Sequence, residues 1–239
     1  TVKNELKKYS VNFKLANRDR LNKSQFRNMG LVIAVGGDGT FLRAAHFIGK
    51  QVLFGVNADV NGKEGFFMKS GKSDFGKKLK NIIKGKFKIR KLPRLAASIN
   101  SKKIKTYALN EFFIGARKSY HAAKYVIKIG KKNERQKSSG VIVSTPAGSC
   151  AWAKSCCNKT LPLNSKDFQY AVREPYEGKV FKNYNLKYGV LNKSQKIKII
   201  SEMLDGILIA DSVGKEHSLK SGNRAVISLS KNYLNAVWE

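Results

Sequence analysis

Short runs of apolar residues, broken by glycine and polar residues, mark the first third of the chain. The continuous run Leu31–Val35 contains β-branched residues and predicts a buried strand. Apolar residues recur at helical spacing after it, which predicts a helix over Phe41–Ile48. A second apolar run, Gln51–Val56, predicts another strand. The closeness of the two strands indicates a β-α-β unit.

The segments around this unit complete an α/β pattern. The sequence predicts a short helix over Val2–Tyr9 and a strand over Val11–Leu15. Asn57–Gly65 is rich in glycine, asparagine and aspartate, and it predicts a loop. The basic segment Ser73–Gly85 predicts a helix with one apolar stripe, made of Phe75, Leu79, Ile82 and Ile83.

The pattern changes near Lys86, where short strand-like runs separated by turn residues replace the helices. A further strand, turn and helix interrupt these runs at Gly140–Cys157. We therefore predict an α/β domain over residues 1–86 and a β-rich domain over residues 87–239. The predicted strands of the second domain are Phe87–Leu92, Leu95–Ile99, Ile104–Leu109, Tyr125–Ile129, Lys196–Ser201, Ile207–Ala210 and Ala225–Leu229.

The formal net charge of +31 raises the question of an anionic partner. Lysine far outnumbers arginine and is spread along the whole chain, and no known nucleic-acid-binding pattern is visible. We therefore favour a general lysine bias that also attracts anionic nucleotides over dedicated nucleic-acid binding. No apolar run approaches the roughly 20 residues that a membrane-spanning helix needs, so no membrane partner is expected.

The number and spacing of the cysteines indicate the redox environment of the protein. Cys150, Cys156 and Cys157 are odd in number and clustered, with no CxxC spacing and no neighbouring histidine. This pattern favours reduced thiols over a disulfide framework or a metal site. No secretory signal is visible at Thr1. We expect a cytoplasmic protein, with the mitochondrial matrix as the alternative.

The run Gly36-Gly37-Asp38-Gly39-Thr40 lies between the predicted strand Leu31–Val35 and the predicted helix Phe41–Ile48. Glycines there let phosphate oxygens approach backbone N–H groups at the positive end of the helix. Asp38 can orient an attacking hydroxyl or accept its proton, as phosphoryl transfer requires. The plainer alternative is a tight turn in which Asp38 or Thr40 caps the helix. The run matches neither the Walker A loop nor the GxGxxG fingerprint.

Two later segments carry further polar groups. In the strand-turn-helix segment that begins at Gly140, the hydroxyls of Ser144, Thr145 and Ser149 suit a ribose or a phosphate, although a capped Pro/Gly turn explains them as well. Asn110-Glu111 lies where one predicted strand meets the next apolar run. An adjacent amide and carboxylate can grip two ribose hydroxyls, and a surface pair at a strand end is the alternative.

In this order and at these separations, the three segments resemble the NAD kinase family. The resemblance covers about residues 31–230, whereas Gly-Gly-Asp-Gly alone is shared with diacylglycerol and sphingosine kinases. Several further segments are similar to the mitochondrial-type branch of the family: Phe54–Asp59, Glu64-Gly65, Ser138–Gly140, Ala151-Trp152, Val172–Pro175 and Leu204–Gly206.

This resemblance implies that the chain transfers the terminal phosphate of ATP to the 2′-hydroxyl of the adenosine ribose of NAD, giving NADP. It implies an α/β (Rossmann-like) domain followed by a β-rich NAD-binding domain, with the active site between them. Asp38 is then the catalytic carboxylate, and Gly36, Gly37, Gly39 and Thr40 form the phosphate turn. The remaining nucleotide-binding residues are Asn57, Asn110, Glu111, Thr145, Ala147, Gly148, Ser149, Ala151, Trp152 and Ser155.

The resemblance also implies Mg²⁺ brought by ATP, no dedicated metal ligands, and a homo-oligomer (a dimer or tetramer). Many family members have aspartate where Ser139 stands and tyrosine where Trp152 stands, but the mitochondrial-type branch shares both changes. Threonine is common where Ala147 and Cys150 stand. Loss of the hydroxyl at Ala147 is expected to alter nucleotide contacts and keep activity. A lipid kinase and a non-catalytic nucleotide- or nucleic-acid-binding module remain the alternative functions.

Overall fold

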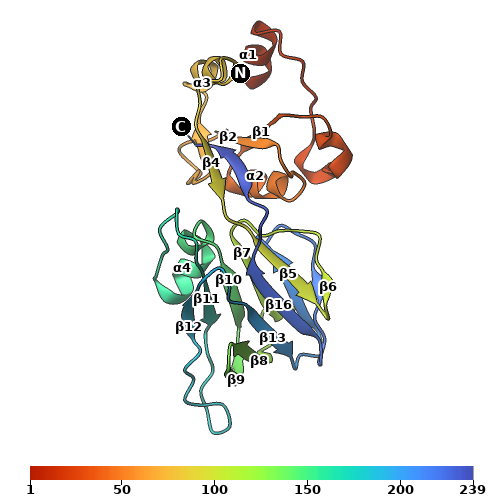
Figure 1. The fold of residues 1–239 in the computed structure, drawn as a ribbon, viewed down its shortest axis with the longest axis vertical. Helices are drawn as coiled ribbons and strands as arrows, with labels where there is room; N and C mark the ends of the chain where they lie inside the picture. Colours follow the sequence, from red (N-terminus) through yellow and green to blue (C-terminus); the bar gives the residue numbers. More distant parts are fainter. Residues whose placement is uncertain (239) are drawn as a thin grey trace. The chain divides into compact units, whose positions relative to one another are not determined.

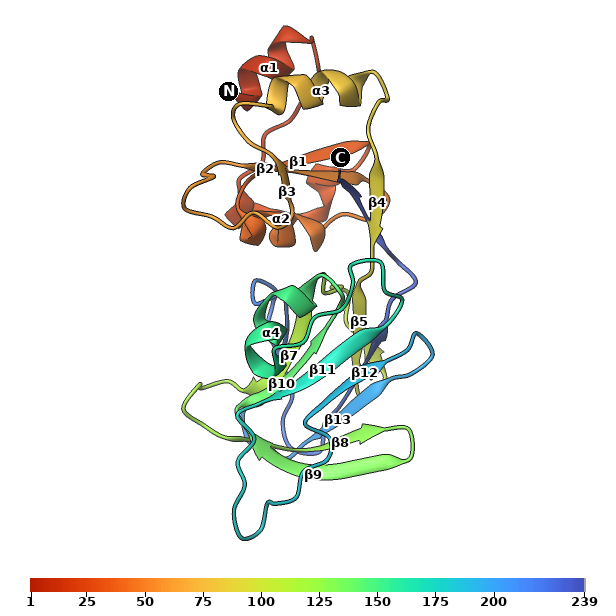
Figure 2. The same cartoon turned by 90° about the vertical axis from the view of Figure 1, so that its left-hand side faces the viewer.

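The computed structural model describes residues 1–238, in which the chain forms two compact units (Figures 1 and 2). The first unit comprises Thr1–Lys91 and the described residues from Leu234 onward, and the second comprises Leu92–Tyr233. The sequence predicts a division near residue 86 and a second domain that runs to residue 239. The structure places the division after Lys91, and it returns the chain to the first unit at Leu234 because the last strand pairs inside that unit's sheet.

The first unit contains the predicted β-α-β unit. Strands β1 (Leu31–Gly36) and β2 (Val52–Asn57) pair in parallel, and helix α2 (Asp38–Ala45) connects them. Strand β17 (Leu234–Val237) pairs in parallel with β2. The sheet has the order β1-β2-β17-β4, and β3 also pairs with β2. The bounds of the other two strands are Met68–Ser70 for β3 and Ile89–Leu92 for β4.

Helices α1 (Val2–Lys8) and α3 (Phe75–Ile83) lie side by side in both views of this unit (Figures 1 and 2). They bury Leu6, Phe75 and Leu79 against Phe54, Val56 and Val237. The short 3₁₀ helices η1 (Arg18–Arg20) and η2 (Lys23–Phe26) precede β1. The predicted strand at Val11–Leu15 was wrong: within the described residues this segment joins no sheet, and Val11 and Phe13 pack against the core instead.

The second unit is β-rich, as predicted, and consists mainly of two antiparallel sheets. One has the order β12-β11-β10-β7-β14-β15, and the other has the order β6-β5-β16-β13-β8-β9. Residues from both sheets, including Phe112, Tyr125, Ile199 and Leu208, share one apolar core. The strand bounds are Leu95–Ile99 (β5), Lys102–Lys103 (β6), Glu111–Ala116 (β7), Ala123–Ile129 (β8), Lys132–Ser138 (β9), Gly140–Ser144 (β10), Phe168–Arg173 (β11), Tyr188–Leu191 (β12), Ile197–Ser201 (β13), Gly206–Ala210 (β14), His217–Ser218 (β15) and Arg224–Leu229 (β16).

Two short helices follow β10, namely η3 (Gly148–Cys150) and α4 (Trp152–Cys157). The predicted strand over Ile104–Leu109 was wrong. Strand β6 ends at Lys103, and the following segment is irregular except for a single bridge between Ala108 and Leu95. Its apolar residues are buried as a connector, which is why their hydrophobicity resembles that of a strand. No helix in the described part of the chain is both long and apolar enough to cross a bilayer.

Candidate active site

The glycine run forms the turn between β1 and α2. Gly37 is the N-cap of α2 and Asp38 is its first residue, so neither Asp38 nor Thr40 caps the helix. A side chain added at Gly39 would meet no atom within 4 Å, whereas one at Gly37 would lie 2.9 Å from Cδ of Lys63. Space is therefore open above the first turn of α2, and the lysine stem lies close beside it.

The carboxylate of Asp38 is held by two backbone groups. The N–H of Phe67 donates to Oδ1 at 2.8 Å, and the N–H of Phe66 donates to Oδ2 at 3.0 Å. The Phe67 ring stacks on Phe41 of α2 with 4.9 Å between centroids, so this backbone is anchored by buried aromatic packing. Each carboxylate oxygen keeps a further lone pair, and an approaching hydroxyl can donate to it.

Asn57 organises the loop that leads to Phe66. Its Oδ1 accepts from the N–H of Asp59 at 3.0 Å, and its Nδ2 donates to the carbonyl of Lys63 at 3.3 Å. Gly65 has φ +69°, and a side chain there would lie 2.7 Å from Asn57 Nδ2. The predicted nucleotide-binding role of Asn57 thus coincides with a side chain that already supports the loop beside Asp38.

In the second unit, Asn110 and Glu111 are buried at the start of β7. Glu111 pairs in register with Ser144 of β10. Asn110 Oδ1, Glu111 Oε2 and Ser144 Oγ are buried and have no hydrogen-bond partner among residues 1–238. Such groups are costly unless something satisfies them, so an ordered water or a polar ligand is expected to contact these atoms.

Asp211 fixes the backbone of this pair, and the sequence did not point to it. Its carboxylate accepts hydrogen bonds from the backbone N–H groups of Leu109 at 2.9 Å, Asn110 at 2.6 Å and Glu111 at 3.1 Å. Asp211 is almost fully buried and directly follows β14, with φ +52°. The only signal in the sequence is an aspartate at the end of a predicted strand.

Burial, and to a lesser extent the negative charge of Asp211, together raise the pKa of Glu111 to about 8. Glu111 is therefore mainly protonated at neutral pH. A protonated carboxyl can donate one hydrogen bond and still accept others, which suits a ligand with hydroxyl groups.

The turn after β10 packs on the backbone of Asn110. Thr145 donates from Oγ1 to the carbonyl of Leu109 at 2.6 Å and accepts from the N–H of Gly148 at 3.1 Å. A side chain at Gly148 would lie only 2.0 Å from the carbonyl oxygen of Asn110. Ser149 Oγ donates to the carbonyl of Pro146 at 2.7 Å. These hydroxyls are engaged within the unit, and Ala147 is buried beside them.

Helix α4 presents an aromatic group. The Trp152 ring stacks on Phe113 of β7 with 5.1 Å between centroids, and the guanidinium of Arg173 lies 4.8 Å from the Trp152 ring. Ala151 and Ser155 are exposed, and the hydroxyl of Ser155 donates to the carbonyl of Trp152 at 2.7 Å. Arg173 is a residue that the sequence did not single out for the site.

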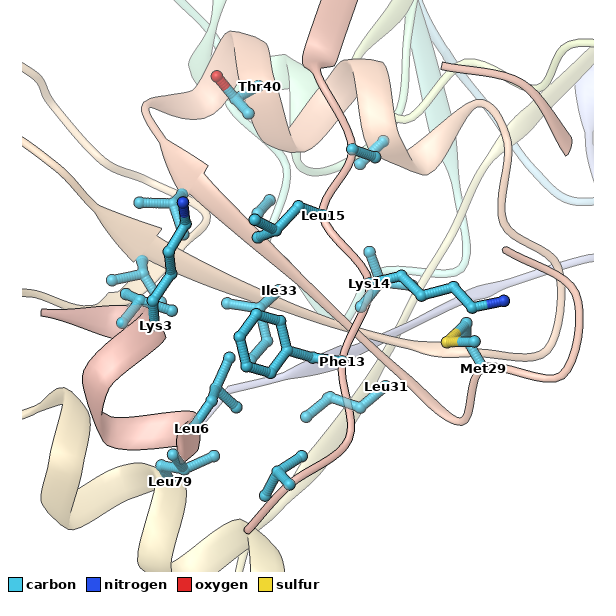
Figure 3. A pocket seen from close by; sticks show the side chains of 18 of the residues that line it. Lys3, Leu6, Phe13, Lys14, Leu15, Met29, Leu31, Ile33, Thr40 and Leu79 are labelled. Atoms are coloured by element: carbon cyan, nitrogen blue, oxygen red, sulfur yellow. The ribbon is translucent and has the colours of Figure 1, made fainter. Parts of the chain in front are cut away.

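A separate apolar pocket of about 1240 Å³ lies within the first unit (Figure 3). Figure 3 shows Leu31 and Ile33 of β1 on one side of it, with Leu6 of α1 and Leu79 of α3 nearby. Thr40 also lines this pocket, and Arg18 approaches the Thr40 hydroxyl at 3.5 Å. The pocket is therefore adjacent to the glycine turn. Within residues 1–238, no group of three or more histidine, cysteine, aspartate or glutamate side chains is arranged to hold a metal ion.

Comparison with known proteins gives consistent matches. Residues 1–87 match the family model of the ATP-NAD kinase N-terminal domain. An NAD kinase of Clostridium tetani is 31% identical over 196 residues, which span 80% of this chain and 68% of that protein. A probable NADH kinase of Oryza sativa subsp. japonica is 26% identical over 257 residues, spanning 98% of this chain and 78% of that protein.

Solved structures share the fold. The crystal structure of an NAD kinase from Archaeoglobus fulgidus in complex with ATP has a TM-score of 0.82 at 23% identity, covering 99% of this chain and 88% of the other. The structure of yeast NADH kinase complexed with NADH has a TM-score of 0.79 at 19% identity, covering 92% of this chain and 64% of the other. Both likenesses support the predicted α/β unit followed by a β-rich unit.

Proposed function

This chain belongs to the NAD kinase family, and on that premise we propose that it transfers the terminal phosphate of ATP to the 2′-hydroxyl of the adenosine ribose of NAD. In that reaction the ribose oxygen forms a bond to the γ-phosphorus while the bond to the β–γ bridging oxygen breaks. The products are NADP, ADP and the proton of the hydroxyl. The relative crystallised with ATP supports ATP as the donor.

The observation that carries this proposal is the fixed carboxylate of Asp38. Two backbone N–H groups hold its oxygens, and the open space above Gly39 leaves room for a phosphate at the positive end of α2. We assign Asp38 to align the 2′-hydroxyl and accept its proton. Phosphoryl transfer depends more on positioning and electrostatics than on a strong base, so a carboxylate on a rigid turn is sufficient. Gly36, Gly37 and Thr40 complete the turn.

We assign Asn110 and Glu111 to hold the NAD ribose. Their unpartnered oxygens, with that of Ser144, can form hydrogen bonds with the hydroxyl groups of a ribose. Thr145 and Ser149 shape the turn that supports them, because their hydroxyls bond to the unit's own backbone. The side-chain amide of Asn57 supports its own loop in the same way, by bonding to the carbonyl of Lys63. Gly148, which has no side chain, lets the turn pack closely against the backbone of Asn110.

The remaining contacts belong to the nucleoside ends of the substrate. We assign Trp152 to stack on a base or on the nicotinamide, with Ala151 and Ser155 beside it. Ala147, buried in the turn, lacks the hydroxyl common in the family, and we propose that this changes nucleotide contacts and keeps activity. The plant relatives named as NADH kinases support placement near the mitochondrial-type branch.

The two alternative functions are less well supported. A lipid kinase shares only the Gly-Gly-Asp-Gly turn, whereas the sequence matches here extend over most of the chain. A non-catalytic nucleotide-binding module would still use the unpartnered atoms of Asn110 and Glu111, but it leaves the fixed carboxylate of Asp38 without a role. The charge of +31 suits a polyanionic nucleotide as well as it suits RNA.

We further propose that ATP enters as its magnesium complex, and that the protein forms a homo-oligomer, as the family resemblance implies. The free thiols of Cys150, Cys156 and Cys157 support a reducing compartment, and we propose the cytoplasm. Sedimentation of the purified protein will give the number of subunits.

The proposed activity is tested by incubating the purified protein with NAD, ATP and magnesium and measuring NADP. Parallel reactions contain NADH as the acceptor or polyphosphate as the donor. Asp38→Asn is expected to lower turnover by about 10²- to 10⁴-fold and to leave NAD binding within a few fold of the wild type. An absence of phosphorylated dinucleotide from every donor and acceptor, together with tight RNA binding, would reverse the assignment.

A further inference from the structure

A cluster of aromatic and cationic side chains lies beside Phe66, whose backbone N–H donates to Asp38. The function proposed above does not use this cluster. Lys69 Nζ lies 3.9 Å from the centroid of the Trp238 ring, and the guanidinium carbon of Arg90 lies 4.9 Å from the same centroid. The Phe66 ring meets the Trp238 ring edge to face at 6.1 Å. Two cations and an aromatic ring thus converge on one indole within the first unit.

Lys69 connects this cluster to Asp38. Its Nζ donates to the carbonyl of Phe66 at 2.7 Å, and the N–H of the same Phe66 donates to Asp38 Oδ2 at 3.0 Å. Both backbone polar groups of Phe66 are therefore hydrogen-bonded: its carbonyl accepts from the ammonium of Lys69, and its N–H donates to the carboxylate of Asp38. Phe67, next in the chain, supplies the other donor to Asp38.

The indole restricts where the ammonium of Lys69 can lie. A lysine side chain has several rotatable bonds, and an exposed one loses entropy when it holds a single hydrogen bond. Stacking on Trp238 fixes the end of the side chain above the ring, so the hydrogen bond to Phe66 costs less ordering. Strand β17 in turn places Trp238, whose backbone N–H donates to the backbone carbonyl of Lys88 at 3.1 Å.

The electrostatics agree with this arrangement. Burial lowers the pKa of Lys69, the charge of Asp38 opposes that effect, and the charge of Arg90 adds to it. The ammonium therefore interacts with the Asp38 carboxylate as well as with the backbone between them.

We propose that Lys69, held on Trp238, is a positioning residue that keeps the Phe66-Phe67 backbone against Asp38 and thereby aims the carboxylate at the substrate hydroxyl. This inference rests on the proposed phosphotransfer, and it adds a supporting group that neither the family match nor the sequence analysis assigns. Small errors in the placement of a catalytic group cost large factors in rate, so the effect is expected in turnover rather than in substrate binding.

The test compares Lys69→Met with Lys69→Arg, Trp238→Leu and the control Lys77→Met, which makes the same chemical change at an exposed position on α3. Lys69→Met and Trp238→Leu are expected to lower kcat about ten- to a hundredfold, with KM for NAD and ATP within about twofold of wild type. Lys69→Arg is expected to restore most of the turnover, because arginine keeps the cation and the donor. Lys77→Met is expected to match wild type.

A double-mutant cycle separates positioning from other roles. If Lys69 acts through Asp38, then adding Lys69→Met to Asp38→Asn lowers kcat no further. Full additivity of the two effects would overturn the proposal, and so would an unchanged kcat in folded Lys69→Met. A rise in KM for ATP with kcat preserved would make Lys69 a phosphate ligand and also overturn it. A wild-type chain that makes no NADP would overturn the proposed function itself, and this inference with it.

Discussion

The carboxylate oxygen Oδ1 of Asp211 lies 2.6 Å from the backbone nitrogen of Asn110, although the two residues are 101 positions apart in the chain. This contact and its two neighbours turn the start of β7 into a fixed platform for the side chains of Asn110 and Glu111. The buried carboxylate of Asp211 thus fixes the backbone of the candidate site. Its oxygens already accept hydrogen bonds from backbone N–H groups.

Replacement of Asp211 is expected to affect the ribose site directly. In Asp211→Asn, one carboxylate oxygen becomes an amide group that cannot accept from a backbone N–H. We expect KM for NAD to rise about tenfold and the free energy of unfolding to fall by about 3 kcal/mol. Asp205→Asn is the matched control, because Asp205 is about half exposed and pairs with Arg117 at the surface. Equal behaviour of the two variants in kinetics and denaturation would contradict the role of Asp211.

The raised pKa of Glu111 predicts a pH dependence of stability. Between the ordinary value of 4.5 and about 8, Glu111 stays protonated in the folded state and is ionised in the unfolded state. The folded state then binds more protons, so stability falls as the pH rises through this window. Glu111→Gln removes this contribution. The stability of wild type relative to Glu111→Gln is expected to fall by up to about 1 kcal/mol per pH unit, and to level off above pH 8.

Urea denaturation of both proteins without nucleotide, at intervals from pH 4.5 to pH 9, measures this difference. Using the difference between the two curves cancels the contributions of other titrating groups. A difference that rises with pH, or one that does not change, would show that Glu111 is ionised in the folded protein.

The close approach of Gly148 to Asn110 predicts a steric effect. A β-carbon at position 148 would lie 2.0 Å from the Asn110 carbonyl oxygen and 2.4 Å from its carbon, so backbone must move in Gly148→Ala. We expect a loss of about 2–4 kcal/mol in stability and weaker NAD binding. Gly49→Ala is the control, because its added β-carbon would come no nearer than 3.9 Å to another residue. Calorimetry and NAD titration measure both effects, and retained affinity in a stable Gly148→Ala would contradict the model of the turn.

The sequence alone predicted the elements whose patterns are local. The β-branched run at Leu31–Val35 and the helical spacing after it were enough for β1 and α2, since both strand burial and helix amphipathicity repeat within a few residues. Val11–Leu15 has a strand-like composition, but a strand also needs a partner, and this segment has none in the described part of the chain. The same reason explains the wrong strand at Ile104–Leu109, whose apolar residues Ile104, Ala108 and Leu109 are buried although the segment pairs only through a single bridge at Ala108.

The residues of the candidate site also fall into two groups, those that the sequence suggests and those that only the tertiary structure shows. Asp38 and its glycines, Asn110-Glu111 and the Thr145–Ser149 turn are candidates from the sequence, because their residue types suit phosphate and ribose and the three segments together resemble the NAD kinase family. Only the tertiary structure showed that Asp211 fixes Asn110, that Phe66 and Phe67 hold Asp38, and that β17 brings Trp238 to Lys69. These pairings join residues distant in the chain. They depend on burial and on sheet pairing between strands, which folding decides and which no local run of residues encodes.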